Sequence, residues 1–180
     1  MYGCGPWMRP CVSGKSVWRK AETITLDPEE AMQIETAKFG VIEVEEEKIL
    51  YLPYGLAGFP GEERFVILDK EDTRPFCWLQ CVDVPDIALM LMDPCLFKPD
   101  YSVDLAPVRE EMGWTGEPEN DLLLYVVVRM YSEEAANPEK EAALRLVANL
   151  ASPLLVNAEK RQAVQIVMYD THYSYEHPVV

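Results

Sequence analysis

The strongest constraint on the fold is a series of short apolar runs in which both alternating faces are apolar. These runs cover residues 65–69, 76–82 and 87–92, and the turn-forming segments DKEDTRP and DVPD separate them. A strand with one face in water alternates apolar and polar residues, whereas a strand covered on both sides is apolar throughout. The pattern therefore predicts strands enclosed on both faces, as inside a barrel or beneath a capping element.

Strand-like runs also occur on either side of this central block. The hairpin-like pair Phe39-Gly40 lies between two of them, an acidic turn at 45–47 precedes a third, and the turn NAEKRQ lies between the last two. The β-branched and leucine-rich run at 122–130 is the clearest strand of all. The pattern predicts further strands at 32–36, 41–44, 48–52, 122–130, 154–156 and 163–168.

Two segments have helical signals. Pro107 suits a first helical turn and Gly113 a C-terminal cap, which predicts a helix over 107–112. Asn137-Pro138 resembles a helix entrance, and apolar residues then recur at offsets 0, 3, 4 and 7, which predicts a second helix that stops before Pro153. The residues of this helical face are Ala143, Leu146, Val147 and Leu150. The fold class expected from these patterns is mainly β, in one compact domain over residues 32–180.

The segment 53–61 holds three glycines and two prolines in nine positions, so it predicts a loop. Its Leu56 and Phe59 are expected to tuck back onto the core. The loop lacks the Lys-Ser/Thr ending and the strand-to-helix context of a phosphate-binding loop. We therefore expect a structural loop. No cofactor-binding motif occurs elsewhere in the sequence, so no cofactor is expected.

The chain is strongly acidic, with 16 basic and 31 acidic residues, a net charge of −15 and a pI near 4.5. Binding to a phosphate backbone depends on Lys and Arg, so direct nucleic-acid binding is disfavoured. The acidity favours either a basic protein partner or simple solubility. Four basic and four acidic residues cancel within residues 1–31, so the excess charge lies in 32–180. That aperiodic leading segment predicts a mobile extension, with Met32 as an alternative start.

Several features disfavour export, membrane insertion and a metal site. The leading segment has no signal-like apolar run, and the longest apolar run elsewhere, 122–128, is too short for a bilayer. The five cysteines are accompanied by only two histidines, and Cys4 and Cys11 lie far from both. Cys77 and Cys81 would lie about 13 Å apart on one strand face, too far to bridge. Reduced thiols in a cytoplasmic protein are expected.

One segment offers a catalytic interpretation. Asp170, His172 and Ser174 alternate, so an extended strand would place a carboxylate, an imidazole and a hydroxyl on one face. Their Cα atoms would lie about 6.6 Å apart with parallel side chains, and no nucleophile elbow accompanies them. A terminal polar strand is the favoured interpretation, and we expect that the protein is not an enzyme. The alternative is a small hydrolase that uses these three residues.

Five segments together resemble the flagellar assembly factor family, FliW. The combination of a GLxGF loop, an LQ…DP…F.PDY block and an NL..P…N block is specific, although each part alone would be weak. The segments are MQIETAKFGVIEV, ILYLPYGLAGFPGEERFVIL, PFCWLQCVDVPDIALMLMDPCLFKPDY, NLASPLLVNAEKRQAVQIV and YSYEHPV.

The resemblance implies a small antiparallel barrel-like domain capped by a short helix. It further implies a cytoplasmic, non-enzymatic regulator that binds flagellin and the translational repressor CsrA, and that exchanges these two partners to relieve repression of flagellin translation. A general chaperone-like module for an exported subunit is a further alternative. Candidate partner-binding residues from the family pattern and the C-terminal segment are Gly55, Leu56, Gly58, Phe59, Gln80, Phe97, Tyr101, Asn149, Asn157, Tyr173 and His177.

Overall fold

The computed structural model describes residues 31–116, 118, 122–133, 143–169 and 171–179. The expected extension over 1–31 therefore lies, except for Ala31, outside the described residues. In chain order the elements are β1 (Ala31–Thr36), β2 (Gly40–Glu45), η1 (Glu46–Lys48), β3 (Ile49–Tyr51), β4 (Arg64–Leu68), η2 (Glu71–Thr73), β5 (Cys77–Cys81), β6 (Ala88–Met92), η3 (Pro94–Leu96), α1 (Ala106–Glu111), β7 (Leu122–Glu133), β8 (Ala143–Ala148), β9 (Leu154–Asn157), β10 (Gln162–Gln165) and β11 (His177–Pro178).

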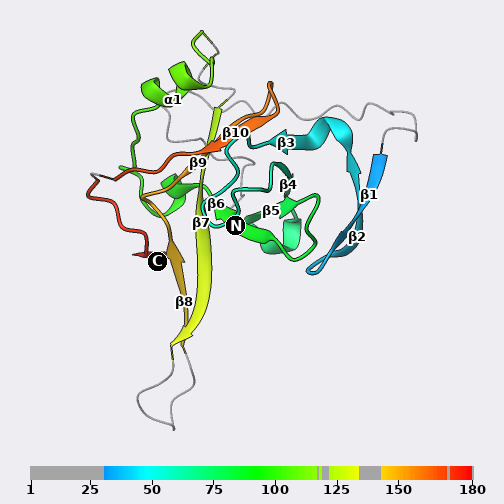
Figure 1. The fold of residues 1–180 in the computed structure, drawn as a ribbon. Coiled ribbons are helices and arrows are strands. Elements are labelled where there is room, and N and C mark those ends of the chain that lie inside the picture. The colour runs from blue at the N-terminus through cyan, green and yellow to red at the C-terminus, as the bar shows by residue number, and fades with distance from the viewer. Residues whose placement is uncertain (1–30, 117, 119–121, 134–142, 170, 180) are drawn as a thin grey trace, which may run out of the picture.

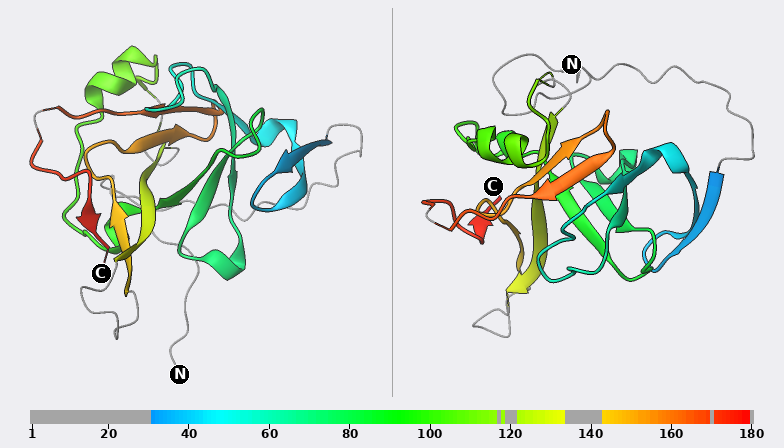
Figure 2. Two further views of the ribbon diagram at one scale, coloured as in Figure 1. Left: turned by 60° about the horizontal axis from the view of Figure 1, so that its bottom comes forward. Right: turned by 45° about the horizontal axis from the view of Figure 1, so that its top comes forward.

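Seven of these strands form a closed barrel. The strand order β7-β6-β5-β4-β3-β10-β9 returns to its start because β9 also pairs with β7. The pairings are antiparallel except for one, where Gln162 of β10 lies parallel to Tyr51 of β3. Figure 1 shows β8 leaving this ring beside the far end of β7, and Figure 2 shows the ring from two further directions. The expected class, a mainly β barrel with a short helix, is confirmed.

The long strand β7 shows why these runs are apolar on both faces. Its even-numbered residues from Leu122 to Val128 are buried in a cluster with Tyr101 and Trp114, on the side of α1. Its odd-numbered residues 123, 125 and 127 pack against a second cluster that contains Phe65 and Leu79. A strand between two cores needs apolar side chains on both faces. The predicted runs are placed in the same way: in β4, Phe65 lies in the second cluster and Val66 in a third, so the prediction of enclosed strands is confirmed.

Two predicted elements are found close to their expected positions. The helix α1 begins and ends one residue earlier than predicted, and Gly113 has a φ of +67°, as a C-terminal cap requires. The strands β1 and β2 pair in register from Ala31 opposite Glu45 to Thr36 opposite Gly40, so the predicted hairpin is confirmed.

The prediction of a second helix is wrong where the structure describes the segment. Residues 143–148 form β8, which pairs with β7 from Val128 opposite Ala148 to Glu133 opposite Ala143. The helical spacing of apolar residues is real, but pairing with a long neighbouring strand overrides local periodicity. Asn137 and Pro138, the predicted helix entrance, lie outside the described residues.

The β1–β2 hairpin forms a separate two-stranded sheet beside the barrel. Ile34 and Val44 face inward and are buried against Ile49, Val66 and Val82 of the barrel. The hairpin is thus docked on the barrel through its own apolar face. Within the described part of the chain, no helix combines the length and the apolarity that a membrane crossing requires.

Candidate functional site

The loop 53–61 is a tight turn fixed to the barrel. Leu56 and Phe59 exchange backbone hydrogen bonds of 3.2 and 2.8 Å. Leu56 is buried and Phe59 is half-buried against the barrel core, so the expectation that both tuck inward is confirmed. The amide of Ala57 donates to Oε1 of Gln165 on β10 at 2.8 Å. The loop therefore presents its tip, Ala57 and Gly58, to solvent in a defined shape.

A second group of candidates meets at the C-terminal segment. The rings of Tyr101 and Tyr173 lie 4.6 Å apart, and those of Phe97 and His177 lie 6.0 Å apart. The amide of Ser102 donates to the Tyr173 hydroxyl at 3.0 Å. These contacts join the segment after η3 to the C-terminal segment, so the structure brings together two stretches that are more than 70 residues apart in the sequence.

Asn149 lies next to this group, because the preceding residue, Ala148, pairs with His177. Its backbone amide donates to the carbonyl of Val127 at 2.9 Å. Its side-chain Oδ1 is buried with no hydrogen-bond partner among the described residues. Asn149 and the aromatic group therefore lie at the same end of β8, the end at Ala148.

Gln80 and Asn157 lie beneath the surface. Both are 0% exposed. The Gln80 amide nitrogen donates to the carbonyls of Cys81 and Pro85 at 3.0 and 3.2 Å, and Asn157 Oδ1 accepts from the amide of Lys160 at 2.9 Å. Both side chains therefore stabilise turns in this structure, and a direct partner contact by either stays a prediction.

The segment suggested for hydrolysis does not form a strand. Residues 171–176 follow an irregular path, and only His177–Pro178 pair with β8, so the prediction of a terminal polar strand is wrong. The Ser174 hydroxyl accepts a hydrogen bond from the Glu176 amide at 3.0 Å, and the His172 ring lies 4.2 Å from that of Tyr173. Asp170 lies outside the described residues. The serine hydroxyl therefore stabilises a local turn in the described part of this segment.

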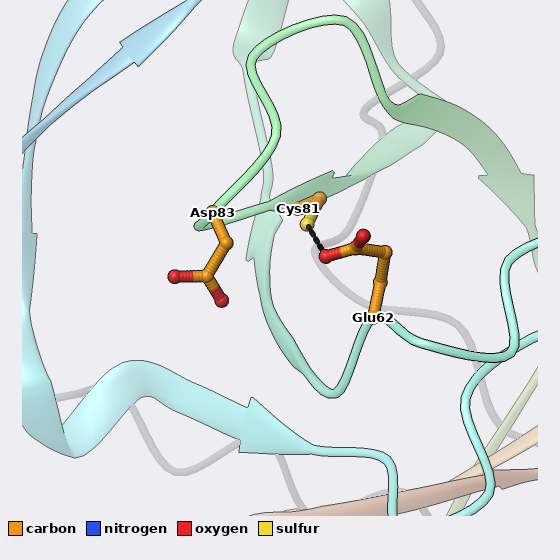
Figure 3. Close-up of side chains that lie close together, drawn as sticks. All are labelled: Glu62, Cys81 and Asp83. Atoms are coloured by element: carbon orange, nitrogen blue, oxygen red, sulfur yellow. Dashed lines mark hydrogen bonds between the residues drawn. The ribbon is translucent and has the colours of Figure 1, made fainter.

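The structure also forms a cluster of ionisable side chains that the sequence did not predict. Possible metal-ligand atoms of Glu62, Cys81 and Asp83 lie within 4.8 Å of one another. Figure 3 shows the three side chains close together. The Cys81 thiol donates to Oε2 of Glu62 at 3.7 Å, and burial raises its pKa. Strand pairing brings the loop before β4 to the end of β5, an arrangement without a local sequence signal.

Charge pairing accounts for the third member of this cluster. Arg64 binds both carboxylate oxygens of Asp83, with Nε 3.0 Å from Oδ2, and this hydrogen bonding lowers the pKa of Asp83. A metal site would need a deprotonated thiol and an available carboxylate. Here the thiol is held in its protonated form and the aspartate binds arginine, so the cluster acts as a polar clasp between β4 and β5.

Cys77 and Cys81 of β5 agree with the expectation of reduced thiols, whereas Cys95 is disulfide-bonded and departs from it. Cys77 and Cys81 are both free and buried. Burial raises the pKa of Cys77 to about 12, so its thiol is unreactive at neutral pH. Cys4 and Cys11 lie outside the described residues.

The fold defines a class of protein: a small seven-stranded barrel with a tight loop at 53–61 and a C-terminal segment that packs against the residues after η3. The family model for FliW protein matches residues 33–179. The chain therefore belongs to the FliW family, which confirms the resemblance seen in its motifs.

Individual relatives agree with this assignment. The chain is 40% identical over 100 residues to the flagellar assembly factor FliW of Caldanaerobacter subterraneus subsp. tengcongensis, covering 54% of this chain and 65% of that protein. It is 41% identical over 96 residues to that of Geobacter sulfurreducens, covering 53% and 60%. These matches thus span less than two thirds of the relatives' length.

A solved structure extends the similarity over a longer stretch. The crystal structure of a flagellar assembly factor FliW matches with a TM-score of 0.68 and 33% identity, covering 83% of this chain and 97% of that chain. The barrel described above is therefore the fold of this family.

Proposed function

We propose that this protein is a cytoplasmic, non-enzymatic regulator of flagellar assembly that binds flagellin and antagonises the translational repressor CsrA. Exchange between the two partners relieves repression of flagellin translation: export of flagellin frees the protein, which then binds CsrA. The observation that carries this proposal is the family match over residues 33–179 together with the shared barrel fold.

The charge of the chain supports a basic partner. The net charge is −15, and an RNA-binding repressor is basic where it holds RNA. Opposite fields accelerate encounter and discriminate against wrong partners. Antagonism arises either by covering the RNA site or by binding beside it and repelling the RNA phosphates.

Exposed aromatic residues near the two candidate regions support a protein partner. Tyr54, in the loop, is 59% exposed, and Tyr175, in the C-terminal segment, is 52% exposed. Tyrosines supply large contact areas and are enriched among the residues that dominate binding energy. We assign them as anchors for the partners.

The experiment is a binding assay with purified CsrA and purified flagellin from the same bacterium. Each should bind the protein alone, and flagellin should displace CsrA. Tyr54→Ala and Tyr175→Ala should each weaken one of the two complexes by about tenfold, equivalent to about 1.4 kcal/mol. Tyr51→Ala, at a 41% exposed tyrosine on β3, is the matched control. Failure of both partners to bind would contradict the proposal.

A second pair of variants tests the alternative of a hydrolase. His172→Ala and Ser174→Ala should retain partner exchange, with only the small loss of affinity that a loosened turn around Tyr175 would cause, because the serine hydroxyl accepts a hydrogen bond from the Glu176 amide. Purified wild-type protein should hydrolyse no generic ester or peptide substrate. A hydrolytic activity that either variant abolishes would replace the regulatory proposal with an enzymatic one.

A further inference from the structure

The β1–β2 hairpin is held rigidly against the barrel at its tip. The amide of Ala37 donates to the carbonyl of Pro85 at 3.0 Å. The Lys38 ammonium lies 4.1 Å from the centre of the Trp78 ring, and Phe39 packs edge-on to the same ring at 5.7 Å. Together with the buried Ile34 on its inner face, these contacts preform the hairpin and fix the course of its outer strand.

The outer strand β1 has an open edge. It pairs with β2 on one side, and no other strand of the described residues pairs with it. Figures 1 and 2 show it as the outermost strand of its side of the molecule. Its sequence AMQIET contains neither proline nor lysine, the residues that commonly block edge strands. Its outer edge is therefore suited to accept another strand.

The outward face of the same hairpin is acidic. Glu35 and Glu43 are exposed, and neither has an ion-pair partner among the described residues. Glu45 binds Lys48 at 2.8 Å, and Lys38 is engaged with Trp78. Val41, opposite Glu35, is 62% exposed and adds an apolar contact on this face. The surface thus combines unpaired carboxylates with an open strand edge.

From this combination we propose that the outer edge of β1 receives an extended, basic segment of a protein partner by strand addition. Main-chain hydrogen bonds to β1 hold the segment in place. Its Lys or Arg side chains pair with the Glu35 carboxylate and are attracted by the carboxylate of Glu43. Pairing with a second copy would bring glutamates together, and like charges on neighbouring strands are destabilising. The inference rests on the proposed function in one respect, namely that the physiological partner is basic.

The test measures backbone amide hydrogen exchange with two kinds of probe. The first probe is purified CsrA, and the second is a synthetic eight-residue peptide of alternating lysine and valine. Each should slow the exchange of those amides of residues 32–36 that do not bond to β2 by about tenfold or more, with little change in β5. A peptide of alternating glutamate and valine is the control and should change nothing.

Charge variants supply a second measurement. Glu35→Lys combined with Glu43→Lys should weaken binding of both basic probes by about tenfold or more. Glu110→Lys combined with Glu111→Lys makes the same change in net charge on α1, at a different part of the surface, and should weaken it much less.

The outcomes separate this inference from the proposed function. If CsrA binds and the exchange of 32–36 stays unchanged, the strand-addition site is wrong while the regulatory role stands. If CsrA and flagellin both fail to bind, the regulatory role is wrong. Strand addition at the edge of β1 is then tested by the lysine-valine peptide alone. An edge already protected in the free protein, or a concentration-dependent dimer through β1, would also overturn the inference.

Discussion

The hydroxyl of Tyr101 donates a hydrogen bond of 2.6 Å to the backbone carbonyl of Leu150. The tyrosine is 2% exposed and the leucine 0%. The bond joins the segment after η3 to the segment between β8 and β9, beneath the ring of Tyr173. Tyr101, a residue of the family pattern, thus connects two segments of the core through its hydroxyl, and its ring packs against the C-terminal segment.

Tyr101→Phe should destabilise the fold by about 1–3 kcal/mol, because the buried carbonyl of Leu150 loses its side-chain donor. Urea unfolding at neutral pH measures the change. Tyr54→Phe, at an exposed position, is the matched control and should lie within about 0.5 kcal/mol of the wild type. Equal stabilities of the two variants would show that the bond contributes nothing.

Two glycines of the loop should respond differently to alanine. Both have positive φ, +62° at Gly55 and +94° at Gly58, which disfavours any side chain. A Cβ at Gly55 would lie 2.6 Å from the carbonyl oxygen of Phe59, whereas a Cβ at Gly58 would meet nothing within 4 Å. Gly58→Ala should lower stability by about 1–2 kcal/mol, and Gly55→Ala by clearly more.

Thermal unfolding checks this ranking. For a chain of this size, 1 kcal/mol corresponds to about 2–4 °C in Tm. A Gly55→Ala variant as stable as Gly58→Ala would mean that the loop shifts freely, and it would remove the argument for a loop of fixed shape.

The sequence predicted the elements whose signals are local. The turn residues around Phe39-Gly40 and the cap at Gly113 act within a few positions, so the hairpin and α1 were placed to within about two residues. The two-sided apolar runs also predicted enclosure, because only covered strands can be apolar throughout.

Non-local features could not be read in this way. β8 forms a strand because β7 extends to Glu133 and offers it an edge, although its own residues have helical spacing. Closure of the barrel depends on β9 meeting β7 and on the single parallel pair between Gln162 and Tyr51. The clasp of Glu62, Cys81 and Asp83 likewise exists only after strand pairing, so no spacing along the chain could indicate it.

Stability should depend on pH through Asp93. Burial raises the pKa of this carboxyl from 3.8 to about 6 in the folded protein. The folded state therefore keeps a proton that the unfolded state releases between about pH 4 and 6. The contribution of this group is largest below pH 4 and is lost as the pH rises through about 6.

Asp93→Asn isolates this effect, because an asparagine Oδ1 can still accept from the Cys95 amide, which lies 2.8 Å from the aspartate oxygen. Relative to the wild type, the variant should gain about 1–2 kcal/mol between pH 4 and pH 7, since one pKa unit equals about 1.4 kcal/mol and solvent screens part of the shift. Urea unfolding at several pH values measures the difference. A difference that is constant with pH would refute the assignment.

The acidic surface should steer the encounter with a basic repressor. If the net charge of −15 steers the encounter, raising the ionic strength from about 0.01 M to about 0.15 M should slow association with CsrA, because the screening length falls from about 30 Å to about 8 Å. Dissociation should change much less, since buried contacts hold the complex and exposed ion pairs contribute only about 0–1 kcal/mol each. Stopped-flow association and dissociation rates at several salt concentrations measure this asymmetry. Native mass spectrometry then distinguishes the two routes to antagonism, because a ternary complex with repressor and RNA would exclude simple occlusion of the RNA site. An association rate that is independent of salt would assign the acidity to solubility alone.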